Sequence, residues 1–197
     1  EPDQLMRCAA AAVAQAARDM LDASDRTGKI LVLAGPGGNG GDGLYAGAEL
    51  AEQGEDVDAY LTAGSAHEPA LEAFRRAGGT VLDAMPESPW DYVLAIDAIT
   101  GIGGTAGLRG ELAEVVEFLD FPLTKVLSVD VPSGIDADTG DGADLHVHAD
   151  ATVTFGGWRR AHVLNPACGT QLLADIGIGE ETLSETLEQL SDEGELG

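Results

Sequence analysis

The 197-residue chain is strongly acidic: 35 Asp and Glu residues face 10 Lys and Arg residues, and the formal net charge is −25 at pH 7. Such a charge repels nucleic acid and anionic membrane surfaces, so we expect neither as a partner. Hydrophobic residues make up 44% of the sequence, which is enough for a folded core. No apolar run approaches the ~20 residues of a membrane span and no signal-peptide pattern is present, so we expect one cytoplasmic domain over residues 1–197.

The acidic residues are interleaved with regular apolar periodicity, which is not the pattern of a disordered chain. Repulsion among so many like charges destabilises a compact chain, and molar salt screens it by reducing the Debye length to about 3 Å. We therefore hypothesise that the protein comes from an extreme halophile.

Apolar periodicity and turn residues predict helices and strands that alternate through residue 130. Helices are expected over residues 3–21, 41–53, 69–77 and 112–119, and strands over 30–34, 57–61, 80–82, 92–96 and 125–129. Beyond them we expect an acidic surface segment at 138–148, late strands at 151–155 and 171–174, and an acidic tail or helix at 179–197. The alternation indicates parallel βαβ units, hence an α/β fold with helices on both faces of a doubly wound sheet.

Residues 29–44 combine a buried strand, a glycine-rich loop and the start of a helix. This order of elements directs backbone N–H groups at an anionic ligand, and glycine lets the backbone approach that ligand closely. The loop also carries Asn39 and Asp42, whose short polar side chains suit a ligand or ion held at close range. A functional loop is therefore favoured over an ordinary strand-to-helix turn.

The loop does not match the usual nucleotide motifs. It lacks the Lys and Ser/Thr of a P-loop, and its G-x-G-x-x-G spacing over residues 38–43 is weak by itself. Asp56 and Asp58 stand at the start of the next strand, not at its end, where a ribose-binding acid belongs. A standard dinucleotide fingerprint is therefore not favoured.

Polar side chains follow three of the predicted strands: Asn39 and Asp42, then Asp97, then Asp130 and Ser133. In a parallel sheet these strand ends meet at one edge, where ligands bind. A buried strand-end aspartate needs a cation, a donor or a ligand hydroxyl, and capping of the following loop is the alternative for Asp97 and Asp130. Asn39, Asp97 and Ser133 offer hard oxygen atoms, which suit an alkali or alkaline-earth cation better than zinc.

Two further pairs are weaker candidates. His146 and His148 could bind a transition metal, but no Cys or third nearby His completes a set, and alternation on a strand would place them on one face anyway. Arg159 and Arg160 could meet a phosphate, although pairing with surface acids is the favoured interpretation.

Four segments resemble, in the family's order, the motifs of the NAD(P)H-hydrate epimerase family, also called the YjeF N-terminal domain. They are residues 35–43, 97–103, 129–140 and 149–156, and the late segment 173–178 is similar to the family's closing motif. The resemblance spans nearly the whole chain.

The resemblance implies a three-layer α/β/α Rossmann-like fold with a mostly parallel central sheet, and a homodimer. It implies an isomerase that interconverts the R and S forms of hydrated NADH and NADPH in nicotinamide cofactor repair. A potassium ion is implied at Asn39, Asp97 and Ser133. Substrate contacts are implied at Gly38, Asn39, Gly40, Gly41, Asp42, Gly101, Ile102, Gly103, Gly104, Thr105, Ala106, Gly107 and Asp130.

The chain departs from the family pattern at several places. Gly38 stands where the family usually has an asparagine, and Trp158-Arg159-Arg160 stands where a lysine is common. The fused dehydratase domain of many prokaryotic members is absent, so we expect a separate NAD(P)H-hydrate dehydratase as pathway partner.

Asp130 is the expected catalytic residue. The hydroxyl-bearing carbon of the substrate is bonded to the ring nitrogen, which can expel the hydroxyl and leave a planar iminium that water re-enters from either face. Asp130 would donate a proton to the leaving oxygen and accept one on return. The alternatives are a non-catalytic nucleotide-binding or scaffold module of the same fold, and an NAD-dependent oxidoreductase, which the missing ribose-binding acid disfavours.

Overall fold

The computed structural model describes residues 3–103, 108, 110 and 112–177; the predicted tail at 179–197 lies outside this part of the chain. Its elements are α1 (Gln4–Asp22), β1 (Lys29–Ala34), α2 (Gly38–Glu52), β2 (Val57–Leu61), α3 (Glu68–Arg76), β3 (Thr80–Leu82), η1 (Pro89–Asp91), β4 (Tyr92–Ala98), α4 (Leu112–Leu119), β5 (Lys125–Val129), β6 (Ala151–Phe155), α5 (Arg160–Leu164), η2 (Pro166–Cys168) and β7 (Thr170–Ala174).

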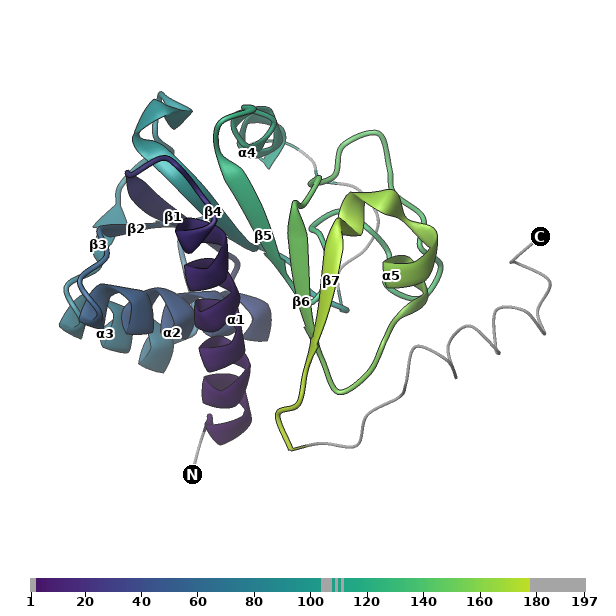
Figure 1. The fold of residues 1–197 in the computed structure, drawn as a ribbon, viewed down its shortest axis with the longest axis horizontal. Coiled ribbons are helices and arrows are strands. Elements are labelled where there is room, and N and C mark those ends of the chain that lie inside the picture. Colours follow the sequence, from purple (N-terminus) through teal and green to yellow (C-terminus); the bar gives the residue numbers. More distant parts are fainter. Residues whose placement is uncertain (1–2, 104–107, 109, 111, 178–197) are drawn as a thin grey trace.

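The strands form one sheet with the order β3-β2-β1-β4-β5-β6-β7, and every described pairing in it is parallel. Helices α1, α2 and α3 lie on one face and α4 lies on the other (Figure 1). The expected α/β fold with three Rossmann-like layers is therefore confirmed.

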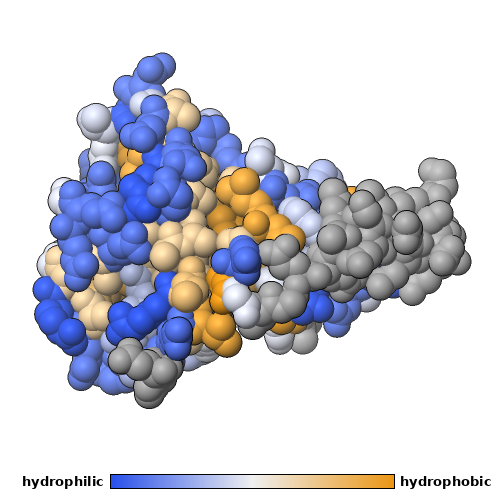
Figure 2. Space-filling view, turned by 60° about the horizontal axis from the view of Figure 1, so that its bottom comes forward, coloured by the Kyte–Doolittle hydropathy of each residue, from blue (hydrophilic) through white to orange (hydrophobic). Residues whose placement is uncertain are grey.

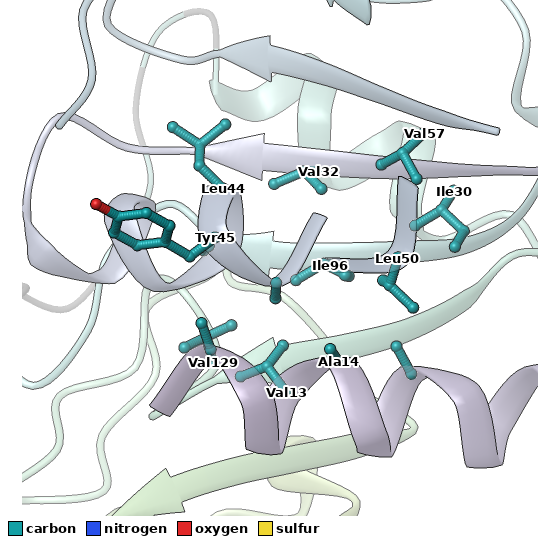
Figure 3. Close-up of a cluster of buried hydrophobic side chains, with 14 of the residues drawn as sticks. Val13, Ala14, Ile30, Val32, Leu44, Tyr45, Leu50, Val57, Ile96 and Val129 are labelled. Atoms are coloured by element: carbon teal, nitrogen blue, oxygen red, sulfur yellow. The ribbon is translucent and has the colours of Figure 1, made fainter. Parts of the chain in front are cut away.

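Both faces of β1 are buried, which explains its unbroken apolar sequence. Ile30 and Val32 point toward the helix pair α1 and α2, and Val13 and Leu44 pack in the same cluster (Figure 3). Leu31, the residue between them, belongs to the cluster beneath α4. Each fully buried side chain of this kind contributes roughly 1.5–3 kcal/mol, so this core holds β1 and α2 against each other.

The strand order reverses between β1 and β4. From β1 the chain builds outward through β2 and β3, then crosses back to β4 on the other side of β1 and continues to β7. The register pairs Leu33 with Asp97 and Asp97 with Ser128, so Asp97 lies at the carboxyl ends of three adjacent strands. In open α/β sheets such a switch point is where ligands bind.

Three local predictions were wrong. Helix α2 begins at Gly38, so the glycine segment forms its first turn, where we expected a loop. The short helix α5 was not foreseen, because five residues show no periodicity. Within the segment expected at the surface, Val147 is fully buried and its N–H donates to the Ser133 carbonyl at 2.9 Å.

Hydrophilic residues cover much of the face shown in Figure 2, and hydrophobic residues gather toward its centre. Ion pairs join Arg18 to Glu49 and Lys125 to Asp150. In the part of the chain that the structure describes, no helix has the length and apolarity needed to cross a membrane.

Candidate functional site

A cavity of about 470 Å³ opens at the carboxyl ends of β1 and β4, at the switch point of the sheet. Three separate segments of the chain form its walls. The lining residues are Pro36, Gly37, Gly38, Asn39, Asp42, Ile99, Thr100, Gly101, Ile102, Gly103 and Asp130. A larger hollow of about 600 Å³ lies near Met85, Glu117 and Phe121, but none of the predicted site residues lines it.

Close backbone packing sets the mouth of this cavity. A Cβ atom on Gly35 would lie 1.9 Å from the Ile99 carbonyl oxygen, and one on Gly40 would lie 1.9 Å from the Gly35 carbonyl oxygen. Only glycine therefore lets the start of α2 approach the ends of β1 and β4 this closely. Asn39 then reaches across the gap, and its Nδ2 donates to the Thr100 carbonyl at 3.0 Å.

The carboxyl group of Asp97 is fully buried and accepts several hydrogen bonds. Ser133 donates twice, from its hydroxyl at 2.5 Å and its backbone N–H at 2.8 Å, and the Ser128 hydroxyl donates at 2.8 Å. Burial raises the pKa of Asp97, and these hydrogen bonds oppose the shift. Asp97 thus also fulfils the capping role that we considered, since the Ile99 N–H donates to it at 3.4 Å.

Oxygen atoms from three segments gather beside Asp97. Ser133 Oγ accepts from the Thr100 N–H at 3.0 Å and lies 3.3 Å from the Thr100 carbonyl oxygen, which also accepts from Asn39. The structure therefore brings together the three predicted ion ligands, Asn39, Asp97 and Ser133. It adds the Thr100 carbonyl, which no side-chain pattern could have revealed. Amide, carboxylate, hydroxyl and carbonyl oxygens fit a hard monovalent or divalent cation.

Asp130 directly follows β5 in the left-handed conformation, with φ +71°. The Thr154 hydroxyl donates to its Oδ1 at 3.0 Å and the Ile102 N–H donates to its Oδ2 at 3.3 Å. These bonds hold the carboxylate where it lines the cavity, and they link the end of β5 to the second glycine-rich loop and to β6. The predicted catalytic residue is thus both a loop cap and a wall of the cavity.

Asp42 provides a second carboxyl group at the same cavity. Burial raises the pKa of Asp42 to about 7, and the negative charge of Asp130 adds to the shift. Sequence reasoning named Asp42 only as a substrate contact. Its ability to hold a proton near neutral pH depends on its burial at the cavity, which the sequence did not reveal.

Not all of the predicted substrate contacts are among the residues that line the cavity. Gly40 and Gly41 are buried against neighbouring atoms of Gly35 and Met6 and do not line the cavity. The expected contacts Gly104, Thr105, Ala106 and Gly107 lie outside the described residues.

The weaker candidates have other local partners. His146 and His148 do not lie on a strand; their ring centroids are 4.6 Å apart, and His146 Nδ1 lies 2.6 Å from the Ala143 carbonyl oxygen. Asp58 lies at the amino end of β2, where it accepts from Lys29 Nζ at 3.2 Å and from the Tyr92 hydroxyl at 2.7 Å. Among the described residues, no three His, Cys, Asp or Glu side chains converge as a metal cluster would.

Several known proteins are similar to this chain along much of its length. The family model described as YjeF-related protein N-terminus matches residues 2–161. A protein of Corynebacterium glutamicum named bifunctional NAD(P)H-hydrate repair enzyme Nnr is 44% identical over 222 residues, covering 98% of this chain and 38% of its own length. The chain thus spans well under half of that relative. A protein of Microbacterium testaceum named NAD(P)H-hydrate epimerase is 42% identical over 186 residues, with 88% of this chain and 71% of its own length covered.

Among solved structures, that of the yeast protein YNL200c is similar with a TM-score of 0.75 and 24% sequence identity, over 87% of this chain and 78% of the yeast chain. This likeness shows a shared fold. The family model covers most of the chain, and relatives at about 40% identity extend over nearly all of it. The chain therefore belongs to the YjeF-related N-terminal family.

Proposed function

We propose that the protein is an isomerase that interconverts the R and S forms of hydrated NADH and NADPH. The observation that carries the proposal is one cavity at the switch point that joins the first turn of α2, the loop at residues 99–103 and Asp130. Two relatives that this chain resembles along much of its length carry names for NAD(P)H-hydrate repair or epimerisation, which supports the same substrate class.

The chemistry requires one proton to leave and return. In the substrate, the lone pair of the ring nitrogen expels the hydroxyl group from the adjacent carbon, and a carboxyl proton converts the departing hydroxide to water. Water then adds to the planar iminium from the opposite face and gives its proton back to the carboxylate. Asp130 is the proposed acid and base, and Asp42 is the neighbouring carboxyl group that holds a proton near neutral pH.

Other groups around the cavity bind and orient the substrate. The first turn of α2 begins at Gly38 beside the cavity, and free N–H groups at a helix start favour the pyrophosphate of a dinucleotide. Backbone of the segment Gly101 to Gly103 lines the opposite wall. Thr154 donates to Asp130 Oδ1 and so helps to hold the carboxylate at the cavity.

A potassium ion is part of this proposal. Asn39, Asp97 and Ser133 would hold it, with the Thr100 carbonyl as a further oxygen donor. These residues belong to one hydrogen-bond network, which Asn39 joins through its Nδ2. The ion would supply positive charge beside the buried Asp97 carboxylate and would tie together the loops that form the cavity. A rise in Tm on replacing Na⁺ by K⁺ at constant ionic strength, absent in Ser133→Ala, would support the site without depending on activity.

The source organism, the location, the oligomeric state and the pathway partner are also part of the proposal. The acidic composition supports an extreme halophile and a cytoplasmic location. The resemblance supports a homodimer, which light scattering would test, and a separate NAD(P)H-hydrate dehydratase that consumes the S form.

The deciding experiment follows conversion of the R hydrate of NADPH to the S form by chromatography, in molar KCl and in molar NaCl, with the spontaneous rate subtracted. Conversion well above background, faster in KCl, is expected. A folded protein that binds the hydrate without converting it would instead indicate a non-catalytic nucleotide-binding module.

A further inference from the structure

His162 is a buried titratable residue that the proposed mechanism does not use. It lies on α5, and only 1% of its surface is exposed. Both of its ring nitrogens have partners: Nδ1 lies 2.9 Å from the backbone nitrogen of Arg159, and Nε2 lies 2.7 Å from the carbonyl oxygen of Asp130. The ring therefore bridges the start of α5 and the residue proposed to carry out the chemistry.

The bond from Arg159 determines the tautomer of the ring. A backbone N–H can only donate, so Nδ1 must accept, and the single proton of the neutral imidazole is on Nε2. From there it donates to the Asp130 carbonyl oxygen. Burial lowers the pKa of His162, which keeps the ring neutral and both bonds intact.

The carbonyl that His162 binds belongs to an unusual backbone. Asp130 has φ +71°, and the only other described non-glycine residue with positive φ is Asp3 near the start of the chain. This conformation is less favourable than the right-handed one for residues with a side chain, although Asp tolerates it better than most, so neighbouring contacts help to hold it. The Asp130 N–H donates to the Val153 carbonyl at 2.6 Å, and the His162 bond fixes the other end of the residue.

We propose that His162 is a positioning residue that holds the Asp130 backbone in its left-handed conformation, so that the Asp130 carboxylate faces the substrate cavity. This inference rests on the proposed epimerase function for its kinetic consequence, but its structural part does not. If the bond to Asp130 is lost, the backbone relaxes toward a commoner conformation and the carboxylate leaves the position that Thr154 and Ile102 define.

Two substitutions separate the two bonds of the ring. In His162→Gln the side-chain nitrogen can take the place of Nε2 and keep the bond to Asp130, while the bond from Arg159 is lost. In His162→Asn the side-chain oxygen can take the place of Nδ1 and accept from Arg159, while the bond to Asp130 is lost. Each variant therefore loses one hydrogen bond, and each serves as the stability control for the other.

We expect kcat to fall about 10- to 100-fold in H162N with little change in KM, and to stay within about threefold of wild type in H162Q, because misplacing a reacting group chiefly slows the chemical step. Equal kcat losses in the two variants, or losses that follow their Tm values, would overturn the proposal.

A second measurement does not depend on activity. Hydrogen exchange at the Asp130 amide, followed by NMR, should be faster in H162N than in H162Q, since the residue is no longer held at its carbonyl. Equal protection in both variants would contradict the positioning role even if the wild-type protein proved inactive. A wild type without epimerase activity but with this difference in exchange would refute the proposed function and keep the structural role of His162.

Discussion

Asp42 and Asp130 line the same cavity but have different surroundings, and these surroundings suit the two carboxyl groups to different roles. Asp130 is held by donors from Thr154 and Ile102, whereas Asp42 lies in α2, half-buried at the cavity, and close enough to Asp130 to be affected by its charge. A carboxyl group that holds a proton close to a second carboxyl group at the same cavity suits a reaction that moves one proton.

Replacing Asp130 with asparagine should remove turnover and leave the fold intact. Asparagine tolerates the left-handed conformation, and its side-chain oxygen can still accept one of the present hydrogen bonds. Because an amide cannot exchange the proton, we expect kcat to fall about 10²- to 10⁴-fold while the Kd for the hydrate changes little. The measurement is single-turnover conversion alongside binding by calorimetry. Near-normal turnover in D130N would remove Asp130 from the mechanism.

Replacing Asp42 with asparagine should change how stability depends on pH. The pKa of Asp42 rises from its ordinary 3.8 to about 7 on folding, so between these values the folded state binds a proton that the unfolded chain does not. Stability from this source is present below pH 4 and is lost as pH rises to about 7, a difference of at most about 4 kcal/mol.

Urea unfolding of wild type and D42N from pH 4 to pH 8, at fixed KCl concentration, would measure this effect. The difference in unfolding free energy between the two proteins should shift in favour of D42N as pH rises toward the folded-state pKa of about 7. At higher pH the difference should be constant. A difference that does not vary with pH would mean that Asp42 is not the group that holds the proton.

At the scale of elements, the junction between β1 and α2 depends on glycines that have no room for a side chain. Gly40→Ala places a methyl group against the Gly35 carbonyl oxygen, whereas for Gly38→Ala the nearest atom among the described residues is the Met6 methyl group at 4.0 Å. We expect G40A to lose at least about 2 kcal/mol of stability through overpacking, and G38A to be neutral or slightly stabilised because alanine favours helix.

Thermal unfolding of the two variants in the same buffer would test this difference. Both residues lie in the first turn of α2, so helix propensity is matched and only the contact differs. Equal Tm values would show that α2 can move away from β1 without cost. Among the described residues there is also space at Gly38 for the Cβ atom of the asparagine usual in the family.

The sequence predicted the helices and strands that show a long apolar pattern. It did not predict local details that depend on tertiary contacts. The apolar run at β1 and the periodicity of α1 were sufficient to place both, because each buries a continuous face. The start of α2 was placed three residues late, since glycine is a poor helix former and only close packing against Gly35 explains a helix there.

The site was foreseen in the same uneven way. Strand ends in a parallel sheet must converge, so the grouping of Asn39, Asp97 and Asp130 could be expected from chain order alone. His162 could not, because α5 is too short to show a pattern and its bond is made to a backbone carbonyl. The raised pKa of Asp42 likewise depends on burial that only the folded chain reveals.

At the scale of the whole molecule, the net charge of −25 is the property that the surrounding salt affects most. The described structure leaves most acidic side chains at the surface. Ion pairs among the described residues include Arg18–Glu49, Lys29–Asp56, Lys29–Asp58 and Lys125–Asp150, besides two that involve His. Unpaired surface acids repel one another, and this repulsion is relieved on unfolding, when the charges move apart.

Melting in low salt and in molar salt should therefore differ strongly. Screening at molar KCl reduces the range of the repulsion to about 3 Å, so we expect Tm to rise by at least about 10 °C between 0.05 M and 2 M KCl. Most of this rise should appear equally in NaCl, because screening depends on ionic strength and not on which cation is present. A parallel series in sucrose, which stabilises by exclusion from the protein surface without screening charge, separates the electrostatic part. If Tm were the same in low and molar salt, the acidic surface would not be an adaptation to salt.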